Sequence, residues 1–169
     1  MMINKSIPRQ ARLTLRTDGA SRGNPGHAGI GGIISDGAGN KLFSFSEYIG
    51  EVTNNVAEYS ALIFGLREAA RVKSGSMVIY SDSELLVKQL NGFYKVKNAG
   101  LKPLFKEAKK LLTRYTGVTI YHVPREDNKE ADKLANQAID DYLAGNKQIT
   151  GVEGLLSDKH GVPGQGSLF

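Results

Sequence analysis

Four acidic residues stand out because of the residues around them: Asp18, Glu58, Asp82 and Asp132. Asp18 and Asp82 each end an apolar, strand-like run, whereas Glu58 and Asp132 lie on apolar stripes of helix-like segments. A buried carboxylate without a partner is costly and is driven towards protonation. No basic residue shares the stripe of Glu58 or Asp132, so a divalent cation would supply the missing charge. Any one of these acids alone is equally typical of a turn or a helix flank, but the four together predict a metal site.

The composition narrows the class of metal and of partner. The 169 residues contain no cysteine and three histidines, so the ligands would be mainly oxygens, which favours Mg²⁺ or Mn²⁺ over structural zinc. The 22 basic and 17 acidic residues give a net charge of +5, which favours nucleic acid over an anionic membrane surface as partner. No signal peptide or spanning segment is apparent, so we expect a soluble, cytoplasmic, monomeric protein without a membrane contact.

The elements that must position the acids follow from periodicity and turn chemistry. Strand signals cover 13–17, 28–35, 41–49, 77–80 and 118–123, and helix signals cover 55–72, 85–90, 101–115 and 128–143. The first three strands are joined by short turns, as in an antiparallel meander, and the later strands alternate with helices, as in parallel units. We therefore predict an α/β fold with a mixed five-stranded sheet, three antiparallel strands and then two parallel, flanked by helices. This domain would span 11–144, after a short extension over 1–10 and before a Gly-rich tail over 145–169.

Five segments in this order resemble type 1 ribonuclease H, across about residues 12 to 144. They are Thr17-Asp18-Gly19-Ala20, Gly23-Asn24-Pro25-Gly26, Thr53-Asn54-Asn55 with Ala57-Glu58-Tyr59, Tyr80-Ser81-Asp82-Ser83, and the run from Asn128 to Ala135. The resemblance implies a ribonuclease H-like fold and hydrolysis of the RNA strand of RNA–DNA hybrids, leaving 5′-phosphate and 3′-hydroxyl ends. It also implies two Mg²⁺ or Mn²⁺ ions, with Asp18 shared between them, Glu58 and Asp82 on one and Asp132 on the other.

The resemblance further implies a substrate-binding role for three asparagines, Asn24, Asn54 and Asn55. In the family these positions lie near the minor groove of the hybrid, where the 2′-hydroxyl distinguishes RNA from DNA. The alternative for each is turn and helix-cap chemistry, and both roles are compatible.

Three departures identify a short form of the family. The loop 124–127 carries no histidine, although many members of the family have one there. His122 is interpreted as structural because it shares strand parity with Val118 and Ile120. Arg125 is a candidate substitute for the missing histidine. Glu84 stands where several members have a glutamine, which puts that substrate contact in doubt. The basic handle between the second and third helices is also missing.

Basic residues around the missing handle offer another phosphate-binding face, or simply a solvated helix face. They are Lys95, Lys97, Lys102, Lys106, Lys109 and Lys110, with Phe93 and Tyr94 beside them. Without the handle, substrate choice could extend to double-stranded RNA. The alternatives are a hybrid- or duplex-RNA-binding module with weak nuclease activity, and, with less support, a DNA nuclease of the same fold.

The last five residues, 165–169, form a separate motif. Gln165, Leu168 and Phe169 resemble the short peptide by which bacterial replication and repair proteins bind the sliding clamp. A Gly-rich tether ending in Leu-Phe suits insertion into an apolar pocket, and a frayed terminus is the alternative.

Overall fold

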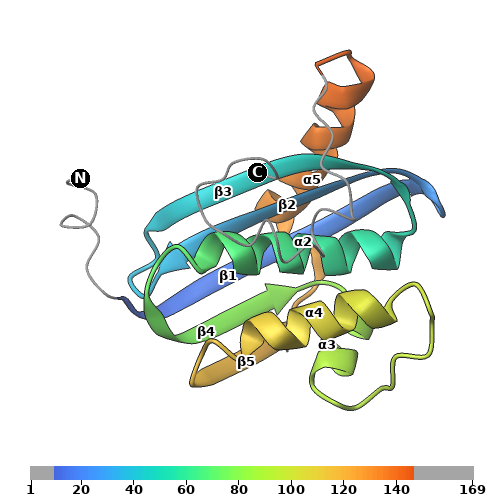
Figure 1. The fold of residues 1–169 in the computed structure, drawn as a ribbon. Helices are drawn as coiled ribbons and strands as arrows, with labels where there is room; N and C mark the ends of the chain where they lie inside the picture. The colour runs from blue at the N-terminus through green and yellow to red at the C-terminus, as the bar shows by residue number, and fades with distance from the viewer. Residues whose placement is uncertain (1–9, 147–169) are drawn as a thin grey trace.

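The computed structural model describes residues 10 to 146, which form one five-stranded sheet with helices on both faces (Figure 1). The strands lie in the order β3-β2-β1-β4-β5, with β1, β2 and β3 antiparallel and β1, β4 and β5 parallel. This is the predicted fold class. The elements are β1 Gln10–Gly23, β2 Gly26–Asp36, β3 Lys41–Val52, α2 Asn54–Ala69, β4 Ser74–Ser81, α3 Glu84–Leu90, α4 Lys102–Leu112, β5 Gly117–His122, the 3₁₀ turn η1 Arg125–Asp127 and α5 Lys129–Leu143.

The main difference from the predicted elements is the length of β1. The sequence predicts a strand that stops before Asp18, whereas β1 continues to Gly23 and pairs residue by residue with β2. Asp18 therefore lies inside a strand, and the prediction that it ends one is wrong. Asp82 does follow the end of β4 directly.

Helices α2, α3 and α4 cover one face of the sheet, and α5 covers β2, β3 and part of β1 on the other (Figure 1). Gly29 and Gly31 on β2 permit this second packing, because a Cβ at either position would come within 3.0 Å of the α5 backbone. The main core lies between the sheet and α2, where Leu13, Leu15 and Leu62 are fully buried. The acids are thus placed where β1, α2, β4 and α5 meet.

The clamp-binding residues Gln165, Leu168 and Phe169, and the domain boundaries drawn at both ends, lie outside the described residues or at their margin. Within residues 10 to 146, no helix is long and apolar enough to cross a membrane.

Candidate metal centre

Three of the four acids predicted from the sequence come together at one site. Asp18, Glu58 and Asp82 each offer a carboxylate oxygen, and these atoms all lie within 4.8 Å of one another. Asp18 comes from the middle of β1, Glu58 from the second turn of α2 and Asp82 from the end of β4. A compact set of carboxylate oxygens suits a hard divalent cation such as Mg²⁺ or Mn²⁺.

Two hydrogen bonds hold Glu58 in place, one to its side chain and one at the start of its helix. Its Oε1 accepts a hydrogen bond of 3.0 Å from the backbone N–H of Gly19, next to Asp18. The helix that carries it begins with a cap, in which the Thr53 hydroxyl accepts from the Val56 N–H. The absence of a Cβ at Gly19 lets β1 approach this turn, because a Cβ there would lie within 3.0 Å of the Ala57 and Glu58 backbone.

Among the described residues, burial and mutual repulsion outweigh the effect of nearby cations on these carboxylates. Burial, followed by repulsion from Glu58 and then Asp82, raises the pKa of Asp18 to about 10. Burial and then Asp82 raise the pKa of Glu58 to about 8, although the Gly19 N–H and the charge of Arg125 act in the opposite direction. A divalent cation would reverse both shifts, because it stabilises the ionised forms.

Asp132, the fourth acid, lies beside this group rather than in it. Its side chain is 30% exposed, and it is close enough to Asp18 for a side-chain hydrogen bond that raises the pKa of Asp18. A partner comes from outside its helix, because Arg125 Nη2 on η1 lies 3.4 Å from Asp132 Oδ1. Arg125 therefore balances the charge of Asp132, whereas Asp18, Glu58 and Asp82 form the acidic part of the site.

One positioning residue was not identified from the sequence. Asn128 is 2% exposed, and its side-chain amide donates a 2.8 Å hydrogen bond to the Thr17 carbonyl beside Asp18. The Asn128 carbonyl accepts from the Asp132 N–H at 3.1 Å. Asn128 thus links the strand of Asp18 to the first turn of α5. Its place before an amphipathic helix marks it as a cap candidate, but its side chain bonds to β1 and does not cap α5.

The three asparagines predicted to bind substrate lie near the start of α2. Asn24, in the turn between β1 and β2, accepts a 2.9 Å hydrogen bond from the Asn54 backbone N–H. All three side chains belong to exposed residues. Asn24 therefore has a structural role in the turn, which was the alternative to substrate binding. Because all three asparagines are exposed, they also leave room for a contact with substrate.

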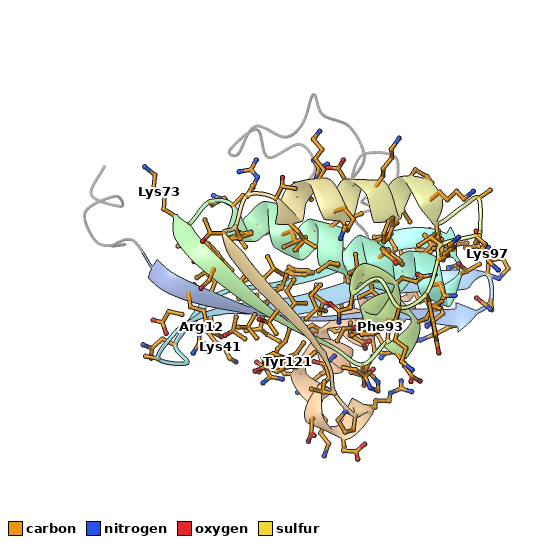
Figure 2. All side chains as sticks on the ribbon, turned by 90° about the horizontal axis from the view of Figure 1, so that it is seen from below. Arg12, Lys41, Lys73, Phe93, Lys97 and Tyr121 are labelled. Atoms are coloured by element: carbon orange, nitrogen blue, oxygen red, sulfur yellow. The ribbon has the colours of Figure 1, made fainter. Side chains whose placement is uncertain are left out.

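Other predicted features are dispersed around the site. His122 is exposed at the end of β5 while Ile120 is buried, so packing in the core does not account for this histidine. Glu84 lies 3.0 Å from Lys88 on the surface of α3, and the hydrogen bond from Lys88, followed by its charge, lowers the pKa of Glu84. Phe93, 76% exposed, and Lys97 project from the segment between α3 and α4 (Figure 2). The lysines at 95, 97, 102, 106, 109 and 110 are all exposed.

Comparisons with known proteins agree with this geometry. Residues 16–138 match the family model described as reverse transcriptase-like. The chain is 41% identical to ribonuclease HI of Halobacterium salinarum, over 79% of this chain and 67% of that protein.

Solved structures give the same result. The RNase H domain of Rv2228c from Mycobacterium tuberculosis superposes with a TM-score of 0.77 at 36% identity, covering 82% of this chain and all of that one. LC11-RNase H1, isolated from compost and solved with an RNA/DNA hybrid, gives a TM-score of 0.74 at 43% identity, covering 78% and 99% of the two chains. The sheet order, the position of the acidic site and these matches show that this chain belongs to the ribonuclease H family of enzymes, in its type 1 branch.

Proposed function

We propose that the chain hydrolyses the RNA strand of RNA–DNA hybrids with two Mg²⁺ or Mn²⁺ ions, leaving 5′-phosphate and 3′-hydroxyl ends. The observation that carries this proposal is the cluster of Asp18, Glu58 and Asp82 within 4.8 Å, with Asp132 beside Asp18. That LC11-RNase H1 was solved with an RNA/DNA hybrid supports the substrate class.

Each acid would have a distinct part in holding the metal. Asp18 interacts with Glu58 and Asp82 and also with Asp132, so its carboxylate would be shared. Bound cations would activate water and stabilise the charge that develops on the leaving oxygen. Arg125 would orient Asp132 through the 3.4 Å contact and bring positive charge to the scissile phosphate.

The substrate would be held by groups on both sides of the acids. Asn24, Asn54 and Asn55 would face the minor groove, where amides read base edges and 2′-hydroxyls, and their exposure near the start of α2 supports this role. The exposed lysines between α3 and the end of α4 would neutralise phosphates, which makes binding dependent on salt.

Replacing Asp82 tests the proposed reaction. Asp82→Asn should reduce hybrid cleavage at least about a thousandfold, because loss of a charged ligand removes several kcal/mol of transition-state stabilisation. Rates would be measured on hybrid, duplex RNA and duplex DNA with Mg²⁺ or Mn²⁺. The product ends would be identified by their sensitivity to a 5′-phosphate-dependent exonuclease.

Asp141→Asn is the matched control, because Asp141 is an exposed acid near the end of α5, and this variant should cleave as the unaltered protein does. Hybrid cleavage by Asp82→Asn at the normal rate, or none by the unaltered protein, would contradict the mechanism. Binding of hybrid or duplex RNA with little cleavage would favour the binding-module alternative.

Asn128→Ala should lower the rate about tenfold and destabilise the fold by about 1 to 3 kcal/mol, because it leaves the buried Thr17 carbonyl unpaired and frees the start of α5. A positioning role further predicts that the Mg²⁺ concentration for half-maximal cleavage rises. Gln137→Ala, on the exposed side of the same helix, is the control and should change neither quantity. An unchanged Mg²⁺ requirement, with only a lower melting temperature, would reduce Asn128 to a structural residue.

A further inference from the structure

Among residues 10 to 146, no helix covers the sheet face beside α5 over β4, β5 and the neighbouring part of β1, and this face has a distinct chemistry. Tyr80 on β4 and Tyr121 on β5 are register partners whose rings stack with centroids 5.6 Å apart. On the other side, the Arg16 guanidinium of β1 lies 4.3 Å from the centre of the Tyr80 ring. Arginine and two aromatic rings thus form one continuous row across three strands.

This row is accessible to a ligand. Tyr121 is 50% exposed, and Thr119 and Arg12 on the same face are also exposed. Figure 2 shows Arg12 and Tyr121 on the side of the sheet away from α2 and α4. Helix α5 packs on β1, β2 and β3 and leaves β4 and β5 uncovered.

The charge of the face favours a polyanion. The outward positions from Arg12 to Arg16 on β1, from Ser76 to Tyr80 on β4 and from Gly117 to Tyr121 on β5 carry two arginines and no carboxylate. Asp18 of the acidic site follows two residues after Arg16 on the same face. Acids lie at the borders of this face. One border is the acidic site, and the other is a hollow of about 470 Å³ lined by Arg16, Lys129, Asp127 and Glu130 among others. Glu130 is already paired with Lys41.

We propose that this aromatic row, Arg16, Tyr80 and Tyr121, binds single-stranded RNA that continues from the RNA strand of a hybrid. Nucleobases stack on exposed aromatic rings and on arginine whatever their sequence, while neighbouring cations contact the phosphates. Exposed Tyr121 provides the free ring face, and Arg12 and Arg16 provide the cations.

The position of the row relative to the acids selects RNA over DNA. Arg16 precedes Asp18 by two residues on the same strand, a distance of roughly 6 to 7 Å. Under the proposed function, on which this inference rests, the strand lying on Asp18 is the RNA strand. Its unpaired continuation would cross the exposed turn η1, past Arg125, and reach Tyr80 and Tyr121.

Binding of a fluorescent RNA oligonucleotide of about eight unpaired nucleotides, measured by anisotropy without divalent metal, tests the row directly. Tyr121→Ala should weaken binding about tenfold, and Tyr121→Phe, which keeps the ring, should retain most of it. Leu143→Ala is the matched control, because Leu143 is a 53% exposed hydrophobic residue at the end of α5. Cleavage of a blunt hybrid should be unchanged in Tyr121→Ala. The unaltered protein should bind a hybrid with an RNA overhang more tightly than a blunt one, and Tyr121→Ala should lose this difference.

Equal RNA binding by Tyr121→Ala and the unaltered protein would overturn the proposal, as would an equal loss in Leu143→Ala. An equal gain in affinity from an overhang on the DNA strand of the hybrid would overturn the assignment to RNA. Because RNA binding is measured without metal or cleavage, it separates this inference from the proposed function. A chain that cuts no hybrid but binds RNA through Tyr121 would support this inference and contradict the proposed function.

Discussion

Asp18→Asn is expected to abolish hybrid cleavage and, in the absence of metal, to make the protein more stable. Activity should fall at least about a thousandfold, since Asp18 is in the cluster with Glu58 and Asp82 and also interacts with Asp132. Stability should rise by about 2 kcal/mol at neutral pH, because burial and the charges of Glu58 and Asp82 force the folded protein to keep this 4% exposed acid protonated, whereas asparagine is neutral at every pH. Urea unfolding in EDTA measures the second effect.

The pH dependence of this gain has a definite sign. The pKa of Asp18 is raised from 3.8 to about 10 in the folded protein, so the folded state binds its proton more tightly than the unfolded chain does. The stability from that proton is complete below about pH 4 and is lost as the pH rises towards 10. The metal-free protein should therefore weaken with alkaline pH, and the advantage of Asp18→Asn should grow over the same window.

Mg²⁺ should reverse the comparison, since a ligand that binds only the folded state stabilises it by mass action. The unaltered protein should gain melting temperature with Mg²⁺, and Asp18→Asn should gain little. Asp141→Asn should follow the unaltered protein in all these measurements. A variant less stable than the unaltered protein at about pH 9 in EDTA would contradict the electrostatic account.

The sequence predicted four acids at one site, of which three converge and Asp132 lies beside them, but it did not predict how each is held. Glu58 was recognised because the helical period places it on the stripe that faces the sheet, and α2 does bury it. Asp18 was misplaced, since Gly19 and Gly23 are typical of turns although β1 pairs with β2 through both. Pairing with a neighbouring strand overrode the local turn preference.

Contacts between distant segments could not be predicted from the sequence. Arg125 pairs with Asp132 from outside the helix, so a search along one helical stripe could not find it. The row of Arg16, Tyr80 and Tyr121 depends on the register of three parallel strands, and only the folded sheet specifies that register. Local periodicity predicts which side chains share a face, but not which strands become neighbours.

Gly19→Ala is expected to have the largest effect of any single methyl group added near the site. The new Cβ would lie within 3.0 Å of the Ala57 carbonyl and the Glu58 N–H, which belong to backbone and cannot rotate away. Helix α2 would have to move off β1, at a cost of about 3 kcal/mol or more. The same movement would break the 3.0 Å hydrogen bond between the Gly19 N–H and Glu58.

Loss of that hydrogen bond should affect activity beyond its effect on folding. Cleavage by the fraction of Gly19→Ala that remains folded should fall about a hundredfold, because a displacement of about 1 Å at a reacting geometry has that scale of effect. Gly75→Ala on β4 is the matched control, since a Cβ there meets only the Thr116 hydroxyl at an ordinary 3.8 Å. Urea unfolding and single-turnover cleavage below the melting temperature would be compared for the two variants. Equal stability of Gly19→Ala and Gly75→Ala would show that α2 does not depend on this close approach. Normal cleavage by a destabilised Gly19→Ala would show that Glu58 finds its place in the site without the Gly19 hydrogen bond.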